Sequence, residues 1–177
     1  MKNYMGYYKI VSYILLVIAG FFALVDLYSL LVALSNPNLL ITLLITVFLL
    51  TSVIIYSFTS FSFFTNGIQK ERQCKPNLKD WIKVNAYVSI AFGLLTLFQC
   101  GIILFSPTAQ TEMIAQFNSM NEKTQTQTIS NQSFLHLIKG MLFWFMVYGV
   151  LLLSHVFITL RLIKEKSNLF GEKTPLV

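Results

Sequence analysis

The sequence predicts an all-α integral membrane protein with four transmembrane helices, arranged as an up-down bundle of two hairpins. Two observations lead to this fold class. Apolar residues make up 55% of the chain and charged residues only 11%, whereas charged residues approach about a quarter of a soluble domain. The apolar residues also gather into four long runs, and each run is long enough to cross a hydrocarbon core of about 30 Å as a helix.

The four predicted spans cover residues 10–34, 39–64, 84–105 and 134–160. None of them contains a proline, so continuous helices are expected. The first run is too long for the apolar region of a signal peptide and is interrupted by Asp26, which predicts a retained span. Together the four spans predict a single membrane domain that occupies residues 1–177.

Two longer connections separate these spans. Residues 66–83 form a strongly basic segment, which we predict to be a cytoplasmic loop between the two hairpins. Residues 107–133 form the predicted external loop. At the start of this loop, Ser106 and Pro107 suit the N-cap and the first position of a helix.

The external loop also contains a helical pattern over residues 108–123. Its apolar residues recur one turn apart, and its polar residues occupy the opposite face. The apolar residues are Met113, Ile114, Phe117 and Met120, and the polar residues are Gln110, Glu112, Gln116, Asn118 and Ser119. This pattern predicts a short amphipathic helix that lies on the membrane surface.

The distribution of Lys and Arg predicts the orientation. Basic residues concentrate at both termini and in the 66–83 segment, while only Lys123 and Lys139 fall on the other side. The concentrated set is Lys2, Lys9, Lys70, Arg72, Lys75, Lys79, Lys83, Arg161, Lys164, Lys166 and Lys173. Because basic residues remain in the cytoplasm, both termini and the 66–83 loop are predicted to be cytoplasmic.

Three polar side chains inside the spans are candidates for chemistry. Asp26 lies about 13 Å below the outer boundary of the first span, and Gln99 and Lys139 fall at a similar depth in two other spans. An ionisable group in a span is a functional hypothesis by default. One reading is a proton- or solute-binding site with Asp26 as the titrating group. The reading we favour is an Asp26–Lys139 pair that fixes the first span to the fourth.

A second polar group is predicted near the cytoplasmic ends of the spans. His155 lies there, and Asn85, with Ser12 or Ser60, falls at a comparable depth. A pH-responsive or metal-binding histidine is one interpretation. A metal site requires several converging ligands, and no second His, Cys or carboxylate is available at this level. A hydrogen-bonded packing histidine is therefore the favoured interpretation.

Function is less determined by the sequence than fold. The motifs GxSxG, HExxH, GxGxxG and the P-loop are absent from the chain. We predict a non-enzymatic accessory or organising subunit of a membrane complex, without metal or cofactor. The expected partners are the lipid bilayer and other membrane proteins or further copies of the chain, and not nucleic acid.

An alternative is a small oligomeric carrier or channel for solutes or ions that uses Asp26. In either case the expected location is a bacterial inner membrane, because frequent Lys, Asn, Ile and Phe with little Ala fit an AT-rich genome.

Overall fold

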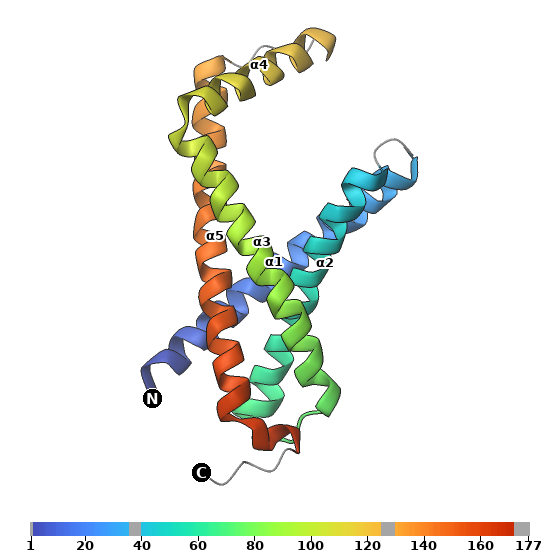
Figure 1. The fold of residues 1–177 in the computed structure, drawn as a ribbon, viewed down its shortest axis with the longest axis vertical. Helices are drawn as coiled ribbons and strands as arrows, with labels where there is room; N and C mark the ends of the chain where they lie inside the picture. The colour runs from blue at the N-terminus through green and yellow to red at the C-terminus, as the bar shows by residue number, and fades with distance from the viewer. Residues whose placement is uncertain (1, 36–39, 125–129, 172–177) are drawn as a thin grey trace. The chain divides into compact units, whose positions relative to one another are not determined.

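The computed structural model describes residues 2–35, 40–124 and 130–171, and all regular structure in these residues is helical. The elements are α1 (Lys2–Ser35), α2 (Leu40–Ser62), η2 (Phe63–Gln69), α3 (Pro76–Phe105), α4 (Pro107–Thr124), α5 (Asn131–Glu165) and η3 (Ser167–Phe170). Four segments are long and apolar enough to cross a membrane: Tyr4–Val32, Leu43–Gln69, Pro76–Phe105 and Gln132–Glu165 (Figure 1). The predicted fold class, with four long apolar helices and one short extra helix, is confirmed.

The helices are longer than the apolar runs that predicted them. The basic segment 66–83 shows this most clearly, because η2 continues to Gln69 and α3 begins at Pro76, so only residues 70–75 lie outside helices. Pro76 suits the first position of a helix, where its missing N–H has no partner to lose. Lys79 and Lys83 are good helix formers. Two of the five basic residues that indicated a loop, Lys79 and Lys83, therefore lie on helical turns, and the other three lie within residues 70–75.

The last turns of the second span form a π-helix, η2, in which Phe63, Phe64 and Gly67 are buried. Gly67 is required by close packing, because a Cβ atom there would lie 2.8 Å from the Cys74 sulfur and 3.1 Å from the Phe63 ring. Burial raises the pKa of the Cys74 thiol. Cys74 therefore contributes to packing and carries less thiolate than an exposed cysteine.

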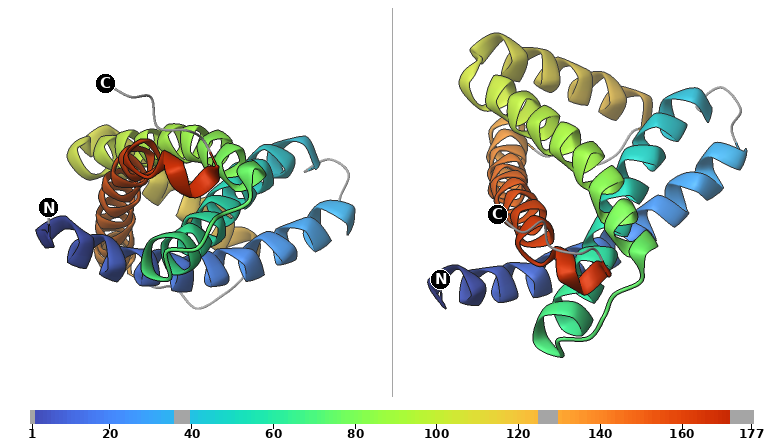
Figure 2. Two further views of the ribbon diagram at one scale, coloured as in Figure 1. Left: turned by 90° about the horizontal axis from the view of Figure 1, so that it is seen from below. Right: turned by 60° about the horizontal axis from the view of Figure 1, so that its bottom comes forward.

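The chain divides into two compact units. The first unit contains Met1–Phe92 and Leu152–Val177, and the second contains Gly93–Leu151, so α3 and α5 each contribute to both. In the first unit α1 and α2 lie side by side and run in opposite directions, which is the first of the two predicted hairpins (Figures 1 and 2). The expectation of a single membrane domain stays a prediction.

The C-terminal turn of the first unit is attached to the segment between η2 and α3. The Cys74 amide donates a hydrogen bond to the Leu169 carbonyl oxygen at 2.7 Å. The rings of Phe63 and Phe170 stack with centroids 5.3 Å apart, and Phe170 is buried. These contacts place η3 next to the basic connection, residues 70–75.

The second unit contains α4, whose start matches the sequence expectation. The Ser106 hydroxyl accepts a hydrogen bond from the Ala109 amide at 3.3 Å, as an N-cap should. The Gln110 amide donates to the Ile103 and Leu104 carbonyl oxygens at 3.1 and 2.9 Å, and so satisfies carbonyls at the end of α3 that have no helical partner.

The burial of α4 follows the predicted amphipathic pattern only in part. Met113, Ile114 and Phe117 are half-buried, and Glu112 and Gln116 are exposed. Gln110 and Asn118, which belong to the predicted polar face, are half-buried as well. The Phe117 ring stacks on Phe134 at the start of α5 with centroids 3.7 Å apart, so the apolar face contacts the protein itself at this point. The predicted role of Met120 lies outside the described side chains, and the placement of α4 on a membrane surface stays a prediction.

In the second unit α3 and α5 approach each other closely at Gly149. A Cβ atom at this position would lie 3.1 Å from Leu97 Cδ2 and 3.6 Å from the Gly93 carbonyl oxygen. Small residues at such contacts let transmembrane helices pack closely.

Gly149→Leu should therefore destabilise the protein, because the larger side chain must displace Leu97; overpacking of this kind costs about 1–3 kcal/mol. The matched control is Gly140→Leu on the same helix, where an added Cβ meets nothing within 4 Å. Thermal unfolding in a mild detergent compares the two variants. Equal losses of stability would show that the close contact at Gly149 is not important.

Candidate functional site

A buried polar cluster joins three helices of the first unit. It consists of Tyr8 and Ser12 on α1, Tyr56 on α2, and His155 and Thr159 on α5, and we call it the His155 cluster. All five side chains are at most 2% exposed. The helical spacing produces this group, because residues four apart on α1 and on α5 lie on one face of their helix.

Both ring nitrogens of His155 are hydrogen-bonded. Ser12 Oγ lies 2.8 Å from Nε2, and the Tyr56 hydroxyl lies 2.8 Å from Nδ1. The Tyr56 hydroxyl is also 2.9 Å from Thr159 Oγ1, and the Tyr8 hydroxyl is 3.1 Å from the same Thr159 oxygen. The cluster is thus a continuous chain of hydrogen bonds from Tyr8 to Ser12.

Bonds to the backbone restrict how the hydroxyl protons of the cluster are arranged. Ser12 donates its single proton to the Tyr8 carbonyl oxygen at 2.7 Å, so its oxygen accepts at the contact with His155 Nε2. Thr159 donates its proton to the His155 carbonyl oxygen at 2.8 Å, so its oxygen accepts from the Tyr8 and Tyr56 hydroxyls. The single proton of Tyr56 serves only one of its two contacts, the one with His155 Nδ1 or the one with Thr159.

The two faces of the imidazole are covered as well. The Tyr8 ring stacks on it with centroids 4.5 Å apart and planes within 2°, and the Tyr56 ring meets it edge-on at 5.8 Å. No group of three or more His, Cys, Asp or Glu side chains in the described part of the chain is arranged to hold a metal ion. His155 therefore has no open ligand position in this arrangement, and its contacts join α1, α2 and α5.

Further contacts extend the same seam toward the ends of α1 and α5. Tyr7 lies 2.7 Å from Ser154 Oγ through its hydroxyl. The Tyr4 hydroxyl donates to Glu165 at 3.2 Å, and the other oxygen of Glu165 pairs with Arg161 at 2.7 Å. The start of α1 thus runs antiparallel to the end of α5, with Tyr4 opposite Glu165 and Ser12 opposite His155.

Asp26 occupies a second buried polar position, between α1 and α2. Its side chain is 5% exposed, and Oδ2 accepts a hydrogen bond of 2.6 Å from the Thr51 hydroxyl. Oδ1 has no hydrogen-bond partner among the described residues. Because a carboxylate is costly in an apolar environment unless it is paired, this oxygen is the least satisfied ionisable atom of the unit.

The predicted group of Asp26, Gln99 and Lys139 is divided between the two units. Asp26 belongs to the first unit, and Gln99 and Lys139 belong to the second. Gln99 is exposed and Lys139 is half-buried. The Asp26–Lys139 pair stays a prediction, and the partner that the structure gives to Asp26 is Thr51, on the neighbouring helix of the same hairpin.

Of the residues predicted to lie near His155, one bonds to it and two have other partners. Ser12 bonds directly to the imidazole, whereas the Ser60 hydroxyl donates to the Ser57 carbonyl oxygen of its own helix. Asn85 donates to the Trp81 carbonyl oxygen at 2.8 Å and lines a groove between α2 and α3. It is therefore not part of the His155 cluster.

Three residues of the cluster were not predicted, namely Tyr8, Tyr56 and Thr159. Tyr8 belongs to a stretch near the N-terminus that resembles an interfacial aromatic anchor, which hides its buried role. The sequence feature that could have identified two of them is the spacing of four residues between Tyr8 and Ser12 and between His155 and Thr159. This spacing places two polar groups on one face of each helix.

Comparisons with protein families, with curated proteins and with solved structures find no match to this chain.

Tyr56→Phe should lower the stability of the protein by about 1–2 kcal/mol, because it leaves His155 Nδ1 and Thr159 without the hydroxyl that bridges them. The matched control is Tyr13→Phe, which keeps the ring contact of Tyr13 with Phe61 and alters a side chain that is 46% exposed. Unfolding in detergent, followed by circular dichroism, measures both. A cluster that does not stabilise the helix packing would give the two variants the same midpoint.

Proposed function

We propose that this chain is a non-enzymatic accessory or organising subunit of a membrane complex. The observation that carries the proposal is the closure of the His155 cluster: its hydrogen bonds run between side chains and backbone carbonyl oxygens of its own residues, and the imidazole offers no open position to a substrate. Such a network suits a polar tie that holds helices in one arrangement.

The proposal includes an orientation, with both termini and the 66–83 segment in the cytoplasm of a bacterial inner membrane. The distribution of basic residues supports it. The contacts between Tyr4 and Glu165 and between Cys74 and Leu169 support it further, because they bring the N-terminal, central and C-terminal basic segments to one end of the first unit.

A second candidate function is a small oligomeric carrier or channel that uses Asp26. The observation that favours it is the buried Oδ1 atom without a partner among the described residues. A carrier needs an acid that is free to bind and release a cation, whereas an organising subunit needs one that is held in a pair. The two candidates therefore differ in the state of Asp26.

The organising role is tested by purification in a mild detergent that preserves membrane complexes. The tagged chain, whose mass is 20.2 kDa, should elute in a larger assembly with other membrane proteins at fixed stoichiometry. The Tyr56→Phe variant should dissociate from that assembly at a lower temperature. Elution as a chain without protein partners, at native expression levels, would contradict the proposal.

The state of Asp26 is tested by a double-mutant cycle with Lys139. Asp26→Asn should destabilise the protein by about 3 kcal/mol if it breaks a buried ion pair, and adding Lys139→Gln should cause no further loss. Lys164→Gln, on the same helix as Lys139, is the matched control for loss of a positive charge. Strictly additive losses would exclude the pair and favour the carrier.

A further inference from the structure

A groove of about 400 Å³ lies between α2 and α3 within the first unit. Four polar side chains line it: Thr51 and Ser52 from α2, and Asp80 and Asn85 from α3. The groove is separate from the His155 cluster, and none of the five cluster residues lines it. Its volume lies within the range of sites for small molecules, about 300–1,000 Å³.

The hydroxyl and amide groups that line the groove already donate hydrogen bonds to other atoms of the protein. Thr51 donates to Asp26 at 2.6 Å, and Ser52 donates to the Phe48 carbonyl oxygen at 2.9 Å. A hydroxyl has one proton, so only lone pairs remain on these two oxygens. Asn85 donates one of its two amide hydrogens to the Trp81 carbonyl oxygen, which leaves its own carbonyl oxygen as an acceptor and one N–H as a donor.

The acidic groups also favour a ligand that donates hydrogen bonds. The Asp80 carboxylate can only accept hydrogen bonds when ionised. Thr51 donates its proton to Asp26, and this makes the Thr51 oxygen a stronger acceptor because neighbouring hydrogen bonds polarise one another. The surface of the groove is mostly apolar, and its polar atoms are chiefly acceptors together with the Asp80 carboxylate, in a protein whose net charge is +6. An anion or a phosphate is disfavoured here.

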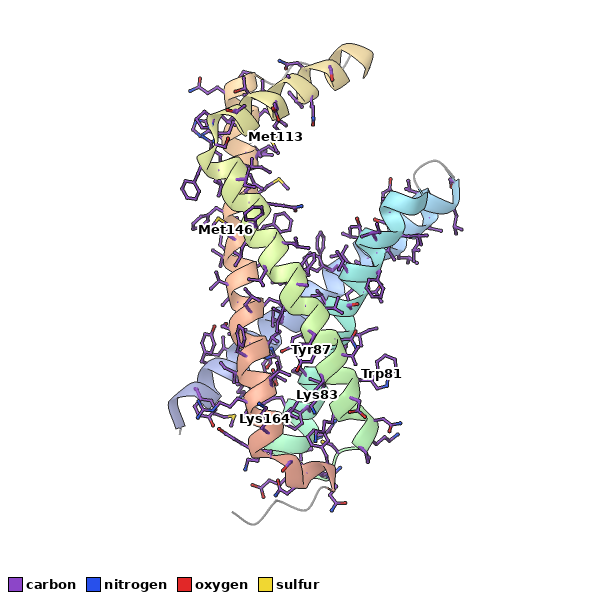
Figure 3. All side chains as sticks on the ribbon, in the orientation of Figure 1. Trp81, Lys83, Tyr87, Met113, Met146 and Lys164 are labelled. Atoms are coloured by element: carbon purple, nitrogen blue, oxygen red, sulfur yellow. The ribbon has the colours of Figure 1, made fainter. Side chains whose placement is uncertain are left out.

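The remaining lining is apolar and aromatic. Phe48, Ile55 and Val84 contribute apolar side chains. Trp81 is 56% exposed, and its ring projects outward from the first turns of α3 (Figure 3). The face of an indole ring attracts cations within about 6 Å.

We propose that this groove binds a primary ammonium group carried on an apolar body. Three N–H donors of the ammonium match the acceptor oxygens of Thr51, Ser52 and Asn85, Asp80 supplies the opposite charge, and the apolar wall takes the hydrophobic body. Two sources have this chemistry, namely the amine head group of a membrane lipid and a free hydrophobic amine. The inference is independent of the organising role proposed above.

The experiment uses Trp81 as the reporter. The chain has two tryptophans, so Trp144→Phe makes Trp81 the only one. The protein is placed in phosphatidylcholine nanodiscs and titrated with dodecylamine in one arm and with phosphatidylethanolamine in the other. Saturable change in Trp81 fluorescence is expected in at least one arm, and the arm that saturates at the lower mole fraction identifies the source.

Two comparisons test the chemistry. Dodecyltrimethylammonium has the same charge and chain but no N–H donor, and it should bind about ten-fold more weakly. Asp80→Asn should weaken primary-amine binding by about ten-fold or more, because it removes a charge-assisted hydrogen bond. Asp80 is exposed, so this variant is expected to fold.

A serine pair provides the matched control. Ser52→Ala removes one acceptor of the groove and should weaken binding by a few-fold. Ser57→Ala removes a serine of the same helix that makes the same kind of bond, to the Val53 carbonyl oxygen at 2.8 Å, and it should leave binding unchanged. Equal binding of the primary and quaternary amines, or full binding by Asp80→Asn, would overturn the proposal.

Discussion

The packing of the first unit depends on the hydrogen bonds of His155. Apolar side chains give little preference between one arrangement of transmembrane helices and another, because lipid tails are as apolar as the helices. A buried imidazole is different, since both of its nitrogens require partners of the correct kind. Ser12 and Tyr56 meet this requirement from two other helices. The cluster therefore fixes how α1, α2 and α5 are rotated and shifted relative to one another.

Asp26 and Thr51 form another hydrogen bond between buried polar groups of different helices, farther along the hairpin of α1 and α2. Asp26 lies about 21 Å beyond Ser12 along α1 and close to the same face of the helix. The 2.6 Å bond to Thr51 joins α1 and α2 directly, whereas the His155 cluster joins them through α5. A shift of α1 along α2 would break the direct bond and strain the bonds to α5.

The sequence predicts the fold well because each span must satisfy its own backbone in the membrane, which long apolar runs reveal directly. The predicted 66–83 loop was less accurate in its extent. Charge marks the membrane boundary there but does not end a helix, and η2 and α3 continue to Gln69 and from Pro76.

Polar side chains were harder to pair than helices were to find. Sequence position gives the depth of a residue, and depth was sufficient to associate Ser12 with His155. Depth says nothing about which face of one helix meets which face of another. Tyr56 was therefore missed, and so was Thr51, an uncharged donor that bonds to Asp26 from the adjacent helix. The pairing of Asp26 with Lys139, which rests on charge balance, stays a prediction.

The polar groups of the first unit fall into two kinds with different consequences. In the His155 cluster the polar side chains are hydrogen-bonded to residues of the cluster itself, so binding an outside molecule there would first require breaking internal bonds. In the groove between α2 and α3, the hydroxyl protons of Thr51 and Ser52 are directed into the protein and their lone pairs remain available. Binding of another molecule therefore breaks fewer internal bonds at the groove than at His155.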